Sequence, residues 1–291
     1  MAALRLLGRL SPVFVQEGLG LLLPVYPWIR SQHARRLRAC FAASPFANQL
    51  TLPSYYRARL RLLLQGLRQH GRSITTESVA VSGIEHYREA LGSGRPVALI
   101  GLHTGVLELL HRIPEAPDNR PFLILTAPAF APALTIYMAG GRQRDGKSII
   151  WNGRPPIGTS SDSSLIAGLR KVLKTNGVLA LMADQNPLGT SKQDFLTLWD
   201  RIEVPYPARL LDFLRERDFQ FVPVSTLLNP DGRSSFRFHP AWKASVTSSG
   251  RPEVMDQASL RTQLRDFLEA GIAAAPEQWN WSYPKIRVRS A

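Results

Sequence analysis

The 291-residue sequence contains a single cysteine, Cys40, so no disulfide can form within the chain and no metal site can be built from several cysteines. This cysteine usage fits a reducing compartment. Because no obvious base stands beside Cys40, we expect a small packed residue there rather than a nucleophile. The chain also lacks the Gly-x-Ser-x-Gly elbow of serine hydrolases and the His-Glu-x-x-His pattern of zinc proteases. Internal repeats and low-complexity tracts are absent as well.

Acidic residues are scarce in the first quarter of the chain. Residues 1–72 hold eleven arginines, no lysine and one acid, Glu17, so most of the formal net charge of +14 belongs to this segment. The remainder of the chain is only mildly basic. A segment whose charge is almost entirely positive predicts an anionic partner: lipid head groups, an acidic carrier protein or nucleic acid.

The N-terminal segment contains an apolar run, residues 10–29, that is about as long as a bilayer span. Three prolines and Glu17 interrupt the run, so we interpret it as a segment at the membrane interface rather than a spanning helix. Tyr26 and Trp28 would then lie at head-group depth. The alternatives are a cleaved signal peptide, an organelle transit peptide, or a helical pair packed on the main domain with solvated arginines.

Residues 33–70 have apolar residues at helical spacing, with arginines between them. We therefore divide the chain into a basic, amphipathic, helical membrane-association segment, 1–72, and an α/β domain, 73–291. Short apolar runs alternate with helical patterns in the second part, which predicts a mainly parallel mixed sheet covered by helices. The expected strands are 75–82, 96–102, 121–126, 147–151, 178–183, 219–227 and 235–239. The expected helices are 83–91, 106–111, 130–139, about 162–174, 207–217 and 260–275.

A histidine and an acid follow the buried strand 96–102. His103 stands at the carboxyl end of this strand, where open α/β sheets build their sites, and Glu108 follows five residues later. Gly105 allows close approach of the backbone, and the helix that begins after it can stabilise an anion. A carboxylate beside an imidazole fixes its tautomer and raises its basicity. The pair therefore predicts a general base, although a core-edge histidine with a salt-bridged neighbour would give the same pattern.

A second carboxylate ends the strand 178–183. Asp184 is followed by Gln185 and Asn186, polar side chains that can orient a substrate. If the two strands are neighbours in the sheet, Asp184 lies close to His103. An ordinary strand-to-loop turn would also contain Asp, Asn, Pro and Gly.

These blocks, together with the tail PEQWNWSYPKIR, resemble the lipid A late acyltransferase family, the LpxL/HtrB-like lysophospholipid acyltransferases. Family members carry a His-x4-acid motif in a block similar to LIGLHTGVLELL and a second block similar to GVLALMADQNPLG. An arginine followed by a glycine lies between the two blocks, and Arg142 fits best, with Arg144 as the competitor. The resemblance covers roughly 85–291, and the combination of blocks carries it. The chain departs from the family pattern around Thr104 and at residues 106–107.

The resemblance implies a direct transfer of an acyl group by an O-acyltransferase. His103 would be the general base, Glu108 would orient it, and Asp184 would support the site. Arg142 would stabilise the thioester oxyanion or bind an acceptor phosphate. Gly105, Arg144 and Gln185 complete the predicted substrate-binding residues. No metal and no cofactor are expected, because the thioester donor is already activated.

The implied partners are an acyl carrier protein or acyl-CoA as donor, a membrane lipid as acceptor and an anionic membrane surface, with no nucleic acid expected. The implied location is the cytoplasmic face of the cell inner membrane, with peripheral or monotopic attachment. One alternative keeps the chemistry with an acceptor other than lipid A, such as another glycolipid, an aminolipid or a polyene-type lipid. A second alternative is a basic scaffold without enzyme activity that binds membrane or nucleic acid. The aromatic tail, 279–283, either closes the site or lies at the interface, or it packs in the core and fixes the C-terminus.

Overall fold

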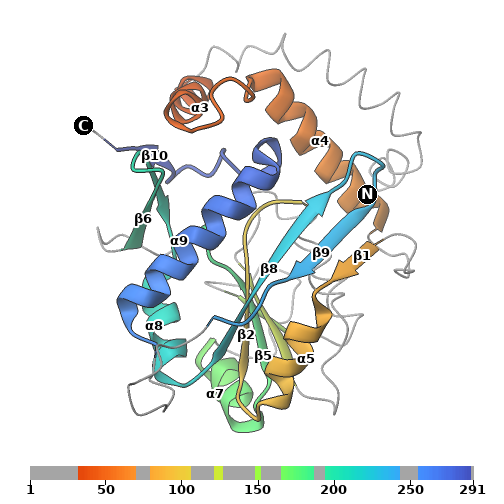
Figure 1. The fold of residues 1–291 in the computed structure, drawn as a ribbon, viewed down its shortest axis with the longest axis vertical. Coiled ribbons are helices and arrows are strands. Elements are labelled where there is room, and N and C mark those ends of the chain that lie inside the picture. Colours follow the sequence, from red (N-terminus) through yellow and green to blue (C-terminus); the bar gives the residue numbers. More distant parts are fainter. Residues whose placement is uncertain are drawn as a thin grey trace.

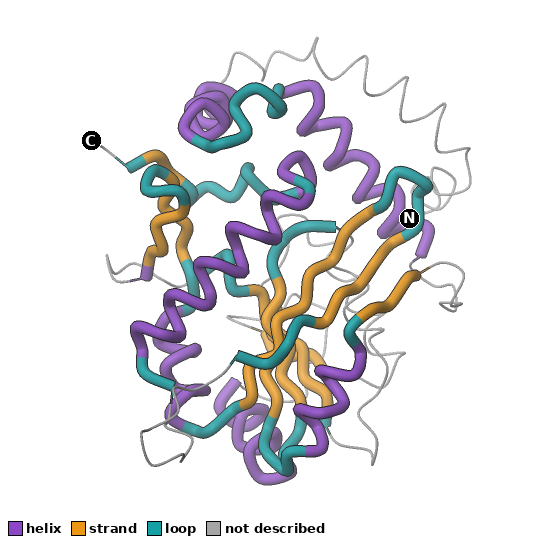
Figure 2. The backbone as a smooth tube through the Cα atoms, viewed as in Figure 1, coloured by secondary structure: helices purple, strands orange, loops and turns teal. Residues whose placement is uncertain are grey.

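A computed structural model describes residues 32–69, 79–105, 121–126, 148–151, 165–186, 194–242 and 255–289 (Figures 1 and 2). Seven of the described strands form one mixed sheet in the order β1-β9-β8-β2-β5-β3-β4. The five neighbours from β8 to β4 run parallel, whereas β9 pairs antiparallel with β8 and parallel with β1. The predicted α/β fold with a mainly parallel mixed sheet is therefore confirmed. Its strands are β1 (Val79–Ser82), β2 (Val97–Gly101), β3 (Phe122–Thr126), β4 (Ser148–Trp151), β5 (Val178–Met182), β8 (Gln220–Leu228) and β9 (Ser234–Phe238).

The central strand β2 is buried on both faces, as expected for a parallel sheet that is covered by helices. Alternate side chains of a strand point to opposite faces, so Ala98 and Ile100 enter one core while Val97 and Leu99 enter the other. The helix α5 (Ile84–Gly92) contributes to the second core. The first and larger core contains residues of α3, α4, α8 and α9, which are described below. This two-sided cover leaves the ends of the strands as the place for a site.

The helices begin and end close to their predicted positions where the structure describes them. The remaining helices of the α/β part are α7 (Leu165–Thr175), α8 (Ala208–Glu216), α9 (Gln257–Ala274) and the short 3-10 helix η6 (Pro276–Gln278). Asp256 begins α9 by accepting a hydrogen bond of 2.6 Å from the backbone N–H of Ser259, which is a normal N-cap. The helices expected over 106–111 and 130–139 lie outside the described residues.

A second, three-stranded antiparallel sheet, ordered β10-β7-β6, was not predicted. Its strands are β6 (Phe195–Leu198), β7 (Ile202–Pro205) and β10 (Arg287–Val288). The hairpin between β6 and β7 turns through Trp199 and Asp200, which have φ angles of 47° and 59°. Glycine and asparagine normally occupy such positions, so the usual hairpin signal is missing from the sequence.

The helical region predicted over 33–70 consists of two helices, α3 (Gln32–Ala43) and α4 (Leu52–Gln69), separated by a turn. Thr51 and Ser54 exchange hydrogen bonds at the start of α4, which satisfies free backbone N–H groups there. Both helices bury apolar residues in the larger core: α3 contributes Leu37 and Phe41, and α4 contributes Leu52 and Tyr55. In Figure 1 they lie at the end of the molecule toward which β8 runs.

Side-chain bonds fasten these two helices to the C-terminal segment. Arg36 donates a hydrogen bond of 2.8 Å to the Ser282 carbonyl, and the Ser282 N–H donates to the Tyr55 hydroxyl at 3.1 Å. Among the described residues, no helix is long and apolar enough to cross a membrane. The apolar run 10–29 lies outside those residues. Its interfacial role and the division at residue 72 stay predictions.

Candidate active site

The parallel pairing of β2 and β5 brings His103 and Asp184 together. Gly101 of β2 pairs with Met182 of β5 in the register. His103 follows Gly101 by two residues, and Asp184 follows Met182 by two residues. The Ala183 N–H continues the ladder by donating to the Gly101 carbonyl at 2.9 Å. Because β2 and β5 are neighbours, the expectation that Asp184 lies near His103 is met at the carboxyl edge of the sheet.

Asp184 accepts two hydrogen bonds from His103. The imidazole Nδ1 lies 2.7 Å from Oδ1, and the backbone N–H of His103 donates to Oδ2 at 2.8 Å. This two-point contact fixes both the backbone and the ring of the histidine. The His103 side chain keeps 21% of its surface exposed, whereas that of Asp184 keeps 1%. The carboxylate is thus an internal support, and the ring is the part that another molecule can reach.

Trp279 supplies a third donor to the same carboxylate. Its indole Nε1 lies 2.7 Å from Oδ2 of Asp184, and both side chains are buried. Burial alone would raise the pKa of Asp184, but the positive charge that His103 carries when protonated and the hydrogen bonds from His103 and Trp279 hold it below its usual value. Asp184 is therefore ionised at neutral pH and accepts a hydrogen bond from the Nδ1–H group of His103. The tautomer that results leaves the lone pair on Nε2 of His103.

The tail that contains Trp279 is anchored from several sides. The Asn280 N–H donates to the His103 carbonyl at 3.0 Å, so the tail also holds the backbone of the histidine. Gln278 bonds both backbone groups of Leu228 in β8, at 2.9 and 2.8 Å. Trp281 is fully buried, packs edge-to-face on Trp279 with ring centroids 4.6 Å apart, and donates to a backbone carbonyl at 2.7 Å. The aromatic tail packs in the core, as one of the two interpretations predicted, and it also bonds the carboxylate behind the histidine.

Thr104 and Gly105 tie the loop after β2 to β8. The Thr104 hydroxyl donates to the Thr226 carbonyl at 2.9 Å, and the Thr226 hydroxyl donates back to the Thr104 carbonyl. Gly105 has a φ of +58°, and a Cβ atom there would lie 2.4 Å from the Thr226 carbonyl oxygen. Glycine is required at this position by the close approach of the two backbones. A role of Gly105 in substrate binding stays a prediction.

Gln185 follows Asp184 and is partly buried. Its side-chain Nε2 is buried and finds no hydrogen-bond acceptor in the part of the chain that the structure describes. Buried amide N–H groups without an acceptor are rare in proteins, so this one is a candidate donor to a ligand. The other predicted site residues, Glu108, Arg142 and Arg144, lie outside the described residues, so their positions are not part of this geometry.

The described residues do not support two other kinds of site. Within the described ranges, no cluster of three His, Cys, Asp or Glu side chains is suited to a metal ion. The stretch 141–148, GRQRDGKS, matches the spacing of a nucleotide-binding P-loop. In a P-loop the final Lys-Ser opens a helix, but here Ser148 is the first residue of the strand β4. Ser148, the described end of the stretch, therefore does not open a helix as the end of a phosphate-binding loop does.

A family comparison agrees with the geometry. The model of the bacterial lipid A biosynthesis acyltransferases matches residues 63–287, which include β2, β5 and the aromatic tail. The chain belongs to this family. As a member of the lipid A biosynthesis acyltransferases it is an enzyme that transfers acyl groups, so the alternative of a scaffold without activity is set aside. No curated protein matched the chain in a sequence search.

In this acyltransferase, sequence reasoning missed the part that Trp279 plays. The tail motif drew attention to the tryptophans, but the sequence has no local signal that joins an indole to a carboxylate 95 residues earlier. The orienting role expected of Glu108 stays a prediction, because Glu108 lies outside the described residues. Asp184 occupies Nδ1 of His103, the atom through which an orienting carboxylate acts.

Proposed function

We propose that the protein moves a fatty acyl group from an acyl-carrier-protein or acyl-CoA thioester to a hydroxyl of a lipid or glycolipid in lipid A-type biosynthesis, with His103 as the general base. The observation that carries this proposal is the buried Asp184 carboxylate bonded to Nδ1 of a partly exposed His103. A histidine supported in this way has a free Nε2 and a fixed ring, as a base requires.

The proposed reaction proceeds in two steps. Nε2 of His103 takes the proton from the acceptor hydroxyl while its oxygen attacks the thioester carbonyl carbon. The carbonyl oxygen becomes an oxyanion, and the tetrahedral intermediate then expels the thiolate. The thiolate receives the proton from Nε2, which leaves an ester, a thiol and neutral His103. Asp184 stabilises the imidazolium between the two steps without taking up a proton itself.

The remaining site residues have proposed parts in the same reaction. Asp184 is the orienting carboxylate, and Glu108 stays a proposed member of the site. Arg142, with Arg144 as the alternative, is proposed to bind the oxyanion or an acceptor phosphate. The side-chain amide of Gln185, which has no hydrogen-bond acceptor among the described residues, is proposed as a further donor to the oxyanion. Such donors contribute most to the rate when they point at the atom on which negative charge develops in the transition state.

The proposed setting is the cytoplasmic face of the cell inner membrane, with peripheral or monotopic attachment. The family acts on lipid, and the first 72 residues carry eleven arginines against one acid, which supports contact with an anionic surface.

Replacing His103 by Ala tests the proposal. The backbone N–H of residue 103 still reaches Asp184 in this variant, so the fold should persist, as measured by circular dichroism and thermal unfolding. Transfer from a radiolabelled acyl-carrier thioester to lipid should fall by about 10²–10⁴-fold or more, the usual contribution of general base catalysis. His86→Ala, on α5, is the matched control and should retain activity.

Full activity of the folded His103→Ala enzyme would refute the assignment of the base. The acceptor is tested separately by mass spectrometry of lipids from a deletion strain. A missing acyl chain on lipid A supports the proposed acceptor, whereas unchanged lipid A with another lipid altered would identify one of the alternative acceptors.

A further inference from the structure

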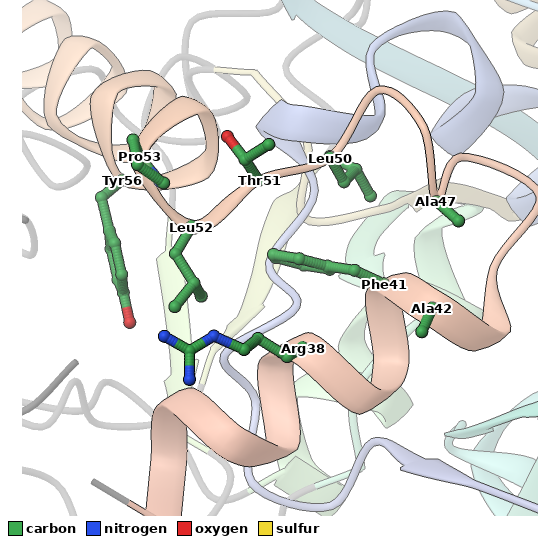
Figure 3. Close-up of a pocket in the computed structure, with 9 residues that line it drawn as sticks. All are labelled: Arg38, Phe41, Ala42, Ala47, Leu50, Thr51, Leu52, Pro53 and Tyr56. Atoms are coloured by element: carbon green, nitrogen blue, oxygen red, sulfur yellow. The ribbon is translucent and has the colours of Figure 1, made fainter. Parts of the chain in front are cut away.

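A pocket of about 460 Å³ lies between α3 and α4 (Figure 3). Its described lining comes from these two helices and the turn between them, and none of it belongs to the proposed catalytic residues. This volume falls within the range of small-molecule sites. The lining residues are Arg38, Phe41, Ala42, Ala47, Leu50, Thr51, Leu52, Pro53 and Tyr56.

The pocket combines an apolar wall with one positive charge. Phe41, Leu50 and Leu52 supply large apolar side chains. Figure 3 shows the guanidinium of Arg38 and the hydroxyl of Tyr56 on the same side of the pocket, away from Ala42 and Ala47. A ligand that fits both parts has an apolar chain and an anionic group at one end.

The charged side chains of the two helices and the turn that form the pocket are all positive. Residues 32–69 contain seven arginines and no lysine, aspartate or glutamate. Arg36 and Arg59 donate to backbone carbonyls of the C-terminal segment. Four others are exposed and take part in no ion pair or hydrogen bond within the described ranges. They are Arg35, Arg38, Arg57 and Arg61.

These four arginines stand three and four positions apart on their helices, so like charges are neighbours on one face. Like-charged pairs at this spacing destabilise an isolated helix. An anionic partner removes this repulsion, which gives the arrangement a physical reason.

We propose that the pocket binds an acyl chain of an anionic membrane phospholipid, whose phosphate is held by Arg38 and the neighbouring exposed arginines. The apolar wall of the pocket and the exclusively positive charge of the two helices together favour this ligand. An acidic protein would match the arginines but leave the pocket unfilled, and a free phosphate would match Arg38 alone. The site is separate from the proposed catalytic centre and does not depend on which residue acts as the base.

The pocket is connected to the catalytic region through aromatic rings. Phe41, which lines it, packs edge-to-face on Trp281 with centroids 5.6 Å apart, and Trp281 packs on Trp279 behind Asp184. A phospholipid held at α3 and α4 would therefore attach the membrane to the same rigid aromatic cluster that supports His103.

Calorimetry on the full chain tests the site with short-chain lipids that stay monomeric. The probes are dioctanoyl phosphatidylglycerol, dioctanoyl phosphatidylcholine, which lacks net charge, and glycerol phosphate, which lacks the chains. Arg38→Gln should weaken phosphatidylglycerol binding about fivefold, the usual effect of one arginine near an anionic surface. Ala42→Phe should weaken it about tenfold by displacing methylene groups from the pocket.

Two matched variants control for these changes. Ala39→Phe adds the same side chain at an exposed position of α3 that does not line the pocket, and Arg209→Gln removes an exposed arginine from α8. Both should bind phosphatidylglycerol as the wild type does. All four variants should transfer acyl groups between detergent-dispersed substrates at the wild-type rate, so a failure of this site is distinguishable from a failure of the proposed function.

Three results would overturn the proposal. One is wild-type affinity for phosphatidylglycerol in both Arg38→Gln and Ala42→Phe. The second is glycerol phosphate binding as tightly as the lipid, which would make the site an anion site. The third is an Arg38→Gln variant that loses affinity for an acidic acyl carrier protein but not for the lipid, which would make the surface a protein-docking site.

Discussion

Replacing Trp279 by Phe removes one hydrogen bond from a buried carboxylate and keeps most of the aromatic volume. The indole donates to Oδ2 of Asp184 at 2.7 Å, in a region where neither side chain is exposed. A hydrogen bond to a charged group contributes about 1.5–3 kcal/mol. We therefore expect the free energy of unfolding to fall by about 2 kcal/mol at neutral pH.

The loss should depend on pH in a definite direction. In the folded protein the pKa of Asp184 lies below its usual value, and the Trp279 bond is one of the causes. The stabilisation that comes from a lowered carboxyl pKa is present above the unfolded pKa, about 3.9, and disappears as the pH falls through the folded pKa. The variant should therefore differ fully from the wild type above about pH 5, and the difference should shrink below about pH 4, as the pH falls through the lowered folded pKa.

Trp281→Phe is the matched control, because Trp281 is equally buried but donates to the Pro276 carbonyl rather than to a carboxylate. Urea unfolding between about pH 2 and 7 should show a loss that shrinks below about pH 4 for the Trp279 variant and a constant loss for the Trp281 variant. Indistinguishable pH profiles for the two variants would refute the reasoning.

Three further substitutions test the supports of the site. Asp184→Asn should lower kcat by about 10²–10⁴-fold, because a neutral amide no longer stabilises the imidazolium; steady-state kinetics measure this, and an unchanged kcat would contradict it. Gly105→Ala should destabilise the fold by about 2–4 kcal/mol in urea unfolding, since φ is +58° and the added Cβ meets the Thr226 carbonyl at 2.4 Å. Gln278→Met should cost about 2–3 kcal/mol in the same assay, because both backbone groups of Leu228 lose their partner. If the Gln278→Met variant loses less than about 0.5 kcal/mol of unfolding free energy, about the level of a surface substitution, water replaces the amide and the prediction is wrong.

Much of the fold was predictable because its signals are local. The strands β2, β5 and β8 are short apolar runs bounded by turn residues, and the structure places them within a residue or two of their expected limits. The positions of His103 and Asp184 just after such runs could also be read directly. The three blocks of the family pattern gave the enzyme class, which the family match confirms.

The small sheet shows where local signals fail. The β6–β7 hairpin turns on Trp199 and Asp200 in left-handed conformations, which bulky residues adopt only when the surrounding structure compensates for the strain. Phe46 packs edge-to-face on Trp199 with ring centroids 5.3 Å apart. The backbone N–H of Trp199 donates a hydrogen bond of 2.8 Å to the Glu269 carboxylate. These partners come from distant parts of the chain, so no short window of sequence contains the reason for the turn.

The sequence by itself determined which residues we propose for the chemistry, a histidine and a carboxylate at two strand ends, and where the arginine-rich segment lies. Only the tertiary structure decided how they are joined. The strand β5 lies between β2 and β3 although β3 and β4 precede it in the chain, and this order brings Asp184 to His103 across 81 residues. The tail then brings Trp279 to the same carboxylate. Periodicity and turn residues encode the elements, whereas the pairing of strands and the partners of a buried charge depend on long-range packing, which no local pattern contains.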